Sequence, residues 1–139
     1  MGYRGYISSR AFFDERVPQR VQNLVIRDYC ERREMKYLLS ATEVAMPGTY
    51  LMLNQLVREL SSIDGIVCYS LFQLPEDNTK RRRIFDSVLE KGRSIHFAVE
   101  ALQLKEKKDI SRLNDIYLVK KTVAFYSHEK DYHELVKLS

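Results

Sequence analysis

Apolar and polar residues alternate along the chain in two different patterns. Short runs of consecutive apolar residues are typical of strands buried in a sheet, whereas apolar residues that recur every three or four positions are typical of one face of a helix. The third run, "GIVCYSLF", is nearly continuous, as expected for a strand buried on both faces of a parallel sheet. The runs that predict strands cover residues 3–8, 36–41, 65–72 and 94–102.

Helices are predicted between and after these strands. Pro18 suits the first turn of the first helix, where its missing N–H costs nothing, and Gly92 suits the left-handed residue just past the third. The last helix is expected over about residues 109–127. The apolar stripes of the helices are, in chain order, Val21, Leu24, Val25 and Tyr29; Leu53, Leu56, Val57 and Leu60; Ile84, Phe85, Val88 and Leu89; and Ile110, Leu113, Ile116, Tyr117 and Val123.

Strands that alternate with helices predict right-handed crossovers and a parallel sheet covered on both faces. We therefore expect a single α/β domain over residues 1–139, a three-layer sandwich with a mostly parallel sheet of about four to five strands in the order 2-1-3-4. Ligands of such sheets bind beyond the carboxyl ends of the strands, where the strand order reverses. The residues predicted to meet there are Ser8, Ser9, Arg10, Ser70, Phe72 and Gln73.

The composition is that of a globular domain, with 45% hydrophobic and 30% charged residues among 139. No apolar run approaches the ~20 residues that cross a bilayer, and "MGYRGYISSR" lacks the apolar core of a secretory signal, so we expect no membrane partner. Cys30 and Cys68 form no spaced framework, which favours a reducing, cytoplasmic setting. The net charge of +4 suits nucleic acid, anionic lipid and phosphorylated metabolites alike.

Three roles are open to Ser8, Ser9 and Arg10. Hydroxyl and N–H groups between a strand and a helix can bind phosphate or carboxylate, and an arginine adds a bidentate donor. A polar turn is the plain alternative, because serines are common in turns for local reasons. A nucleophile is the third, although no neighbouring base for Ser8 is evident. The predicted reversal of strand order favours anion binding.

Four consecutive cations, "KRRR" at 80–83, begin the third predicted helix. Cations in a first turn oppose the helix dipole, so a ligand-binding role that includes Arg81 competes with a solvated helix face. We expect at least two of the four side chains to point away from any shared site, because neighbours on a helix face different directions.

Aromatic and acidic residues at the strand ends complete the candidate site. Tyr6, Tyr69 and Phe72 could stack a sugar or a base, although both tyrosines also suit packing under the helices. Glu100 ends an apolar run, so it must be solvated or paired and is a candidate general base; Glu43 has a weaker claim.

Metal and cofactor signals are missing from the sequence. His96 suits a core histidine, and His128 and His133 in the charged tail have no partner at metal-ligand spacing. No Walker loop or dinucleotide fingerprint is present, so we expect no metal and no tightly bound cofactor. The last helix would expose an apolar stripe unless another copy covered it, which predicts a homo-oligomer.

Four segments in order resemble the catalytic domain of serine recombinases, the resolvases and invertases: "GYISS", "VQNLVIRDYCERREMKYLLSATE", "LMLNQLVRELSSIDGIVCYSLFQL" and "IFDSVLEKGRSIHFAVEALQL". The resemblance places Ser8 at the nucleophile position, but Tyr6 stands where that family has an arginine. Phe72, Gln73 and Glu76 stand where an aspartate and two arginines are expected.

These departures matter because attack on a phosphodiester needs fixed cations for the charge that grows on its oxygens. The resemblance therefore implies the recombinase fold without recombination. The chain to Ser139 also leaves no room for the helix-turn-helix module of that family, so we expect no nucleic-acid partner.

A second resemblance spans nearly the whole chain. The segments "GYRGYISSR", "RVPQRVQNLVIRDYC", "KYLLSATE", "YSLFQLPED" and "IHFAVE" are similar to the sporadic carbohydrate cluster protein family, small bacterial proteins encoded among genes for surface polysaccharide and lipopolysaccharide sugars. This resemblance implies a pathway and brings no catalytic residues.

We therefore expect a cytoplasmic protein of surface-carbohydrate biosynthesis that binds a phosphorylated or nucleotide-linked sugar. The serines and Arg10 would hold the anion and Gln73 the sugar hydroxyls. The sequence leaves open whether the protein is an enzyme; as a cofactor-independent sugar-modifying enzyme it would use Ser8 and Glu100 in catalysis. The alternatives are a recombinase-derived DNA-binding protein and a non-catalytic partner of carbohydrate enzymes.

Overall fold

The structure, a computed structural model, describes residues 1–13, 15–44, 46 and 48–138, and the side chains among them up to residue 124. The strands are β1 (Tyr3–Ser8), β2 (Ala41–Glu43), β3 (Gly65–Cys68), β4 (Ser94–Phe97) and β5 (Leu102–Leu104). The helices are α1 (Gln19–Arg32), α2 (Leu51–Arg58), α3 (Asn78–Glu90) and α4 (Asp109–Leu138), with short 3₁₀ turns η1 (Glu59–Ser62) and η2 (Leu71–Gln73).

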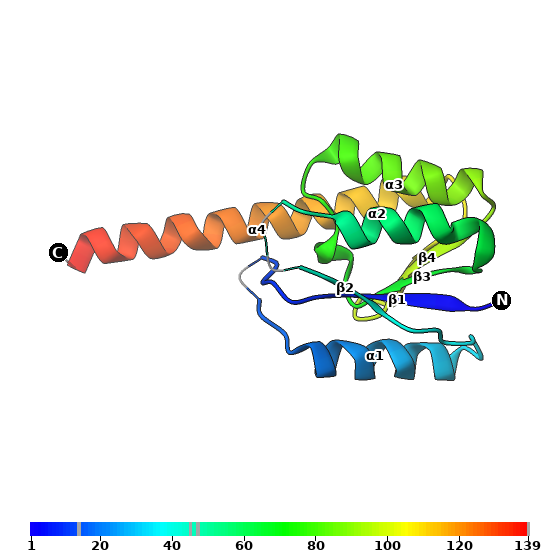
Figure 1. Cartoon of the computed structure of the whole chain (residues 1–139). Helices are drawn as coiled ribbons and strands as arrows, with labels where there is room; N and C mark the ends of the chain where they lie inside the picture. The colour runs from blue at the N-terminus through cyan, green and yellow to red at the C-terminus, as the bar shows by residue number, and fades with distance from the viewer. Residues whose placement is uncertain (14, 45, 47, 139) are drawn as a thin grey trace.

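The strands form one sheet in the order β2-β1-β3-β4-β5, and α1 lies on one face while α2, α3 and α4 lie on the other (Figure 1). Three of the four strand pairings are parallel, and β5 pairs antiparallel with β4. The three-layer α/β fold and the predicted order 2-1-3-4 are therefore confirmed, with β5 added at the edge.

Strand β1 is central because it pairs with both β2 and β3. Ser8 at its end is opposite Glu43 of β2, and Tyr6 is opposite Cys68 of β3. The carboxyl ends of β1 and β3 therefore lie side by side, with their crossovers leaving in opposite directions, which is the place where open α/β sheets bind ligands.

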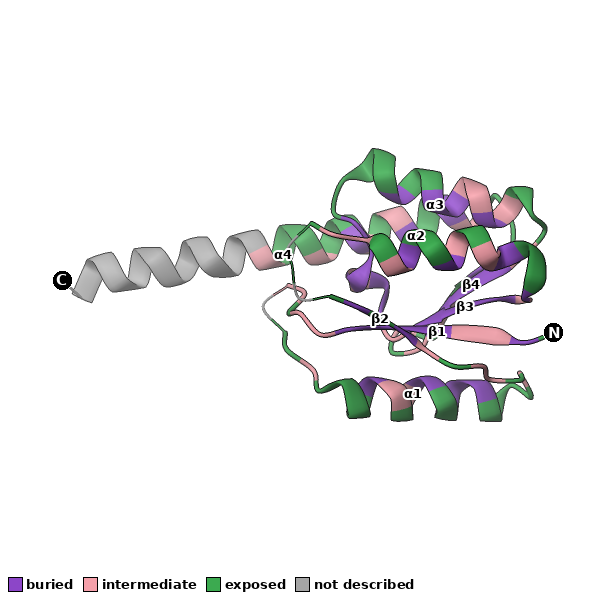
Figure 2. Ribbon diagram, in the orientation of Figure 1, coloured by how far each residue is buried: buried purple, intermediate pink, exposed green. Residues whose placement is uncertain are grey.

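Two hydrophobic cores lie on opposite faces of the sheet, and buried positions follow β1, β3 and the inward faces of the helices (Figure 2). The smaller core packs Ile26 and Tyr29 of α1 against Ile7 and Val67. Cys30 belongs to this core, and its burial raises the pKa of the thiol to about 11, so it stays protonated and unreactive. The larger core lies beneath α2, α3 and α4.

The second strand differs from the prediction. It covers Ala41–Glu43 rather than residues 36–41, and Tyr37 forms only an isolated bridge with Tyr3. Leu39 in the apolar run is 76% exposed. Pairing with the carboxyl half of β1 selects the polar segment as the strand, because main-chain register rather than side-chain hydrophobicity decides an edge strand.

Two other predicted strands end earlier than expected. β3 stops at Cys68, since Ser70 caps the turn η2 by accepting a hydrogen bond from the Phe72 N–H. The predicted strand over 94–102 breaks after Phe97 into a turn that contains Ala101 at φ 53°, and the chain returns as β5.

The apolar stripes of α2 and α3 were largely predicted correctly, whereas the prediction for α1 holds for the buried Tyr29 and is wrong for Val21 and Leu24. Val21 and Leu24 are 42% and 58% exposed, while Gln22 and Ile26 are buried. Pro18 is the N-cap residue of α1 rather than part of its first turn. The left-handed conformation of Gly92 after α3 is confirmed, with φ 65°.

Helix α4 begins at Asp109 as predicted and extends beyond residue 127 to Leu138, running away from the sheet on the side of the carboxyl ends (Figure 1). Leu118, Val119 and Val123 are exposed on it, and self-association through this helix stays a prediction. His128 and His133 lie outside the described side chains. Within the described residues, no helix has both the length and the apolar character that a membrane span requires.

We predict that His96 makes the fold sensitive to acid. Its ring is buried, with Nδ1 at 2.9 Å from the Tyr29 hydroxyl and Nε2 at 2.9 Å from the Ser94 hydroxyl. Burial, helped by Lys105 and Arg33, lowers the pKa of His96 to about 4. Below pH ~6.5 the histidine of the unfolded chain is protonated, whereas His96 of the folded protein stays neutral until the pH approaches its lowered pKa. The free energy of unfolding should therefore fall by about 2 kcal/mol between pH 7 and pH 5.

Urea denaturation at pH 7 and pH 5 measures this loss, with His96→Gln as the control. The variant should be less stable at pH 7 and should lose less stability on acidification. Equal losses in both proteins would show that His96 is not the group responsible.

Candidate functional site

A cavity of about 450 Å³ opens at the carboxyl ends of β1 and β3. Four segments enclose it: the loop after β1, the loop before α2, the turn after β3, and α4. Its lining consists of Ser8, Arg10, Ala11, Phe12, Phe13, Arg16, Gly48, Tyr50, Phe72, Gln73, Leu74, Glu76 and Tyr117. The structure thus brings Ser8, Arg10, Phe72 and Gln73 together, four of the residues predicted from the strand ends.

Ser8 is only 2% exposed and is held by two glutamines. Its main-chain N–H donates to Gln22 Oε1 at 2.9 Å, and Gln22 Nε2 donates back to the Ser8 carbonyl at 2.8 Å. Gln73 Nε2 bridges this pair, at 3.3 Å from Ser8 Oγ and 2.9 Å from Gln22 Oε1. Among the described residues no histidine, lysine or carboxylate forms a hydrogen bond with Ser8 Oγ.

Gln22 was missed in the sequence, and a signal for it exists. It lies four residues before Ile26 and seven before Tyr29, so it shares the buried face of α1. A polar side chain on such a face must find partners in the interior. The stripe that starts at Val21 is one position out of phase and hides this signal.

Arg10 connects the loop after β1 to the loop before α2. Its Nη1 donates to the carbonyls of Met46 and Thr49, at 2.7 Å each, and the guanidinium lies over the Tyr50 ring, 4.5 Å from its centroid. Arg10 therefore brings a fixed positive charge to the cavity, but its Nη1 already donates to main-chain carbonyls of the protein.

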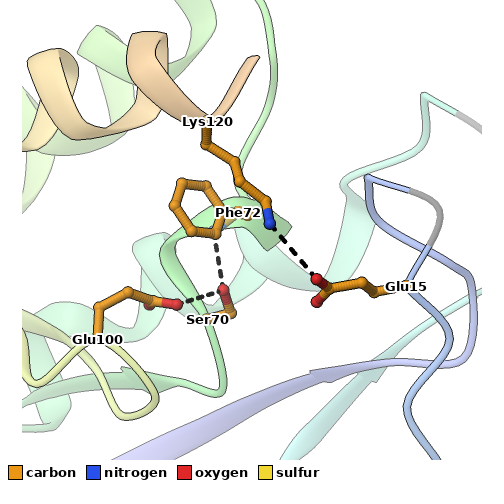
Figure 3. Close-up of polar contacts among 5 residues, drawn as sticks. All are labelled: Glu15, Ser70, Phe72, Glu100 and Lys120. Atoms are coloured by element: carbon orange, nitrogen blue, oxygen red, sulfur yellow. Dashed lines mark hydrogen bonds and ion pairs between the residues drawn. The ribbon is translucent and has the colours of Figure 1, made fainter. Parts of the chain in front are cut away.

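Arg16 is the exposed cation of the cavity lining and was not singled out in the sequence. Beside it, Glu15 forms an ion pair with Lys120 of α4, with 3.4 Å between Oε1 and Nζ (Figure 3). Lys120 also lies over the Phe72 ring, 5.5 Å from its centroid. These contacts link the loop after β1 to α4.

Aromatic rings form one wall of the cavity. Phe13, Phe72 and Tyr117 pack with their ring centroids 5.6 to 5.7 Å apart. The Tyr117 hydroxyl donates to the Leu74 carbonyl at 2.9 Å, and burial raises its pKa. Only Phe72 of this wall was predicted, because Phe13 lies further along the loop after β1 than the residues considered, and Tyr117 comes from α4, which the strand-end argument does not include.

Ser70 and Glu100 lie beside the cavity but do not line it. The Ser70 hydroxyl donates to Glu100 Oε2 at 2.9 Å (Figure 3). The Leu71 N–H donates to Glu100 Oε1 at 2.7 Å. Burial raises the pKa of Glu100, and these hydrogen bonds oppose the rise. Glu100 thereby fixes the turn that positions Phe72 and Gln73.

Ser9 and Tyr6 are also held away from the cavity surface. The Ser9 hydroxyl donates to the Glu43 carbonyl at 2.9 Å, which secures β2 against the end of β1. Tyr6 is fully buried in the larger core and does not line the cavity. The ring of Tyr6 therefore packs in the core, which is the alternative that the sequence offered for this residue. Its hydroxyl lies near Glu43 and Arg10.

The four cations at 80–83 have separate surroundings. Arg81 is buried, over the Tyr117 ring at 4.0 Å, and donates to the Pro75 and Glu76 carbonyls and the side chains of Asn78 and Asn114. Arg82 pairs with Asp86. Lys80 and Arg83 line a second hollow of about 290 Å³, which shares Gly48 and Tyr50 with the cavity.

Comparisons with solved structures define the fold. The chain is similar to a resolvase family site-specific recombinase from Streptococcus pneumoniae, with a TM-score of 0.62 and 9% identity over 97% of this chain and 99% of that one. It is also similar to the N-terminal catalytic domain of TP901-1 integrase, with a TM-score of 0.55 and 13% identity over 93% and 99%. The fold is therefore resolvase-like.

Comparisons of the sequence with known proteins do not assign the chain to a family. No protein-family model matches the chain, and a search of curated proteins finds no match. The similarity to the carbohydrate cluster family therefore stays a prediction.

We predict that Arg81 is a structural residue. Arg81→Ala leaves a cavity and several unpaired acceptors between α3 and α4, so it should lower the free energy of unfolding by about 3 kcal/mol. The matched control is Arg82→Ala on the exposed face, which loses one surface ion pair and should change stability by less than about 0.5 kcal/mol. Urea denaturation of both variants measures the two changes in the free energy of unfolding. Equal stabilities of the variants would show that Arg81 has no structural role.

Proposed function

We propose that this resolvase-fold protein binds a small phosphate-bearing ligand, a phosphorylated or nucleotide-linked sugar, in the cavity at the ends of β1 and β3. The observation that carries the proposal is the cavity itself, of about 450 Å³, with two arginines and several aromatic rings in its lining. Small-molecule sites in proteins are concave, about 300–1,000 Å³ in volume, and largely aromatic and apolar with a few fixed polar groups.

The charges at the cavity support an anionic ligand. Arg16 is exposed and forms no ion pair within the described residues, and the guanidinium of Arg10 adds a second positive charge beside it. An arginine binds phosphate oxygens with paired, charge-assisted hydrogen bonds. Arg16 therefore takes the main anion-binding role that the sequence suggested for Arg10, whose Nη1 serves two main-chain carbonyls.

The polar groups at the cavity also indicate binding rather than chemistry. Both polar atoms of the Gln73 side chain are used internally, with Oε1 accepting from the Ser70 N–H at 3.1 Å. Gln73 therefore positions Ser8 rather than a sugar hydroxyl. Glu76 and Tyr50 are the lining residues left to contact the organic part of the ligand. Assignment to surface-carbohydrate biosynthesis rests on the sequence resemblance alone.

We predict that Arg16→Ala weakens phosphate binding about tenfold or more, because one charge-assisted interaction is lost. Isothermal titration calorimetry with inorganic phosphate, hexose 1-phosphates and UDP-glucose measures the effect. The matched control is Arg20→Ala in the first turn of α1, an arginine that is also exposed but does not line the cavity. If none of these probes binds the natural protein, the proposed function is wrong.

A second candidate, binding or cleavage of DNA, is favoured by the resolvase-like fold and by Ser8 at the end of β1. Cleavage conflicts with the surroundings of Ser8, which is buried and has no base within hydrogen-bond distance in the described part of the chain. We predict no covalent protein–DNA adduct on suicide substrates that trap a recombinase. A trapped adduct that Ser8→Ala abolishes would establish the second candidate, as would duplex binding at low salt that weakens steeply as salt rises.

A further inference from the structure

Three buried side-chain polar atoms from β1, β2 and the loop after β1 have no hydrogen-bond partner among the described residues: Tyr6 Oη, Glu43 Oε1 and Arg10 Nη2. Tyr6 and Glu43 are fully buried, so their free polar atoms receive nothing from bulk water. Buried polar groups in folded proteins are almost always paired, and each exception calls for a missing partner. Three exceptions in one place indicate a shared partner.

The three groups belong to one site. Glu43 is opposite Ser8 in the sheet register, and Tyr6 lies two residues before Ser8 on the same face of β1. Burial is the main cause that raises the pKa of Tyr6; Glu43 raises it further, whereas Arg10 and the neighbouring Ser8 hydroxyl lower it. Both charges therefore lie within electrostatic reach of the Tyr6 hydroxyl.

The surrounding contacts hold the free atoms in place. Glu43 Oε2 accepts a hydrogen bond from the Met52 N–H at 2.8 Å, near the start of α2, which leaves Oε1 as the free oxygen. Arg10 Nη1 is fixed by the carbonyls of Met46 and Thr49, which leaves Nη2 as the free donor. The site is thus arranged before any ligand arrives.

The donor and acceptor pattern identifies the partner. The free Glu43 oxygen can serve as an acceptor, Arg10 only donates, and the tyrosine hydroxyl can do either. A phosphate oxygen would accept from Arg10 but has no hydrogen to donate to Glu43. A hydroxyl group both donates and accepts, so it can satisfy all three residues.

We propose that Tyr6, Arg10 and Glu43 form a hydroxyl-binding subsite that selects a polyol, such as a hexose, attached to the phosphate. This inference rests on the proposed function. Arg10 lines the cavity and also belongs to the subsite, so it joins the phosphate-binding region to the hydroxyl-binding region. The ligand's hydroxyl enters beside Arg10, the partly exposed member of the three.

Tyr6→Phe tests the subsite, because it removes one oxygen and keeps the ring. Calorimetry compares inorganic phosphate with the 1-phosphates of glucose, galactose, mannose and N-acetylglucosamine. In the natural protein at least one hexose 1-phosphate should bind more tightly than inorganic phosphate. Tyr6→Phe should lower the affinity for that hexose 1-phosphate about tenfold, which is equivalent to one lost hydrogen bond. The affinity for inorganic phosphate should stay unchanged.

Glu43→Gln is the second variant, since the amide can still accept from Met52 but lacks the charge. It should lower the affinity for the hexose 1-phosphate, and the affinity for inorganic phosphate should stay unchanged or rise. Tyr29→Phe, in the core on the opposite face, is the matched control: it should lower stability through the lost contact to His96 and leave both affinities unchanged.

The outcomes separate the two proposals. If inorganic phosphate binds and no hexose 1-phosphate binds more tightly, or if Tyr6→Phe leaves the preference intact, the subsite is wrong and the three atoms hold a structural water. In that case Tyr6→Phe should also lower the free energy of unfolding without ligand. If no phosphate compound binds, the proposed function fails first.

Discussion

The pairing of β1 between β2 and β3 is the constraint on which the rest of the structure depends. It buries the carboxyl half of β1 and brings its last residue against the exits of both neighbours. The chain must then leave the sheet in two directions from adjacent strand ends, and the space between the departing loops becomes the cavity. Arg10 and the Glu15–Lys120 ion pair hold those loops in place around it.

Neutral side chains make the hydrogen bonds that surround Ser8. In this chain amides, not cations, surround the serine: Gln22 and Gln73 bind its main chain and its hydroxyl. Neutral amides fix a position without stabilising the negative charge that develops on a phosphoryl group under attack. The positive charges lie instead further out, at Arg10 and Arg16, where they suit the retention of an anion. Similarity at 9–13% identity shows the fold alone, so any reaction has to be argued from the site.

Sequence reasoning succeeded where local pattern and tertiary environment agree. The strand β1, the apolar faces of α2 and α3 and the turn at Gly92 follow from spacing and residue type, because burial on one face imposes that spacing. It failed at β2, whose polar residues form a strand because the neighbouring main chain offers them partners. It failed also on the face of α1, where the buried Gln22 looks polar in sequence and is satisfied only by distant groups.

The sequence by itself determined an α/β order of elements, and hence that Ser8, Arg10, Phe72 and Gln73 would meet at one edge of the sheet, since parallel strands share the direction of their carboxyl ends. Tertiary structure alone decided what each of them does there. It turned Gln73 inward, buried Arg81 against Tyr117, and brought Arg16, Phe13 and Tyr117 to the cavity. The physical reason is that the burial of these side chains depends on residues tens of positions away in the chain. A local sequence pattern does not show which distant residues will contact them.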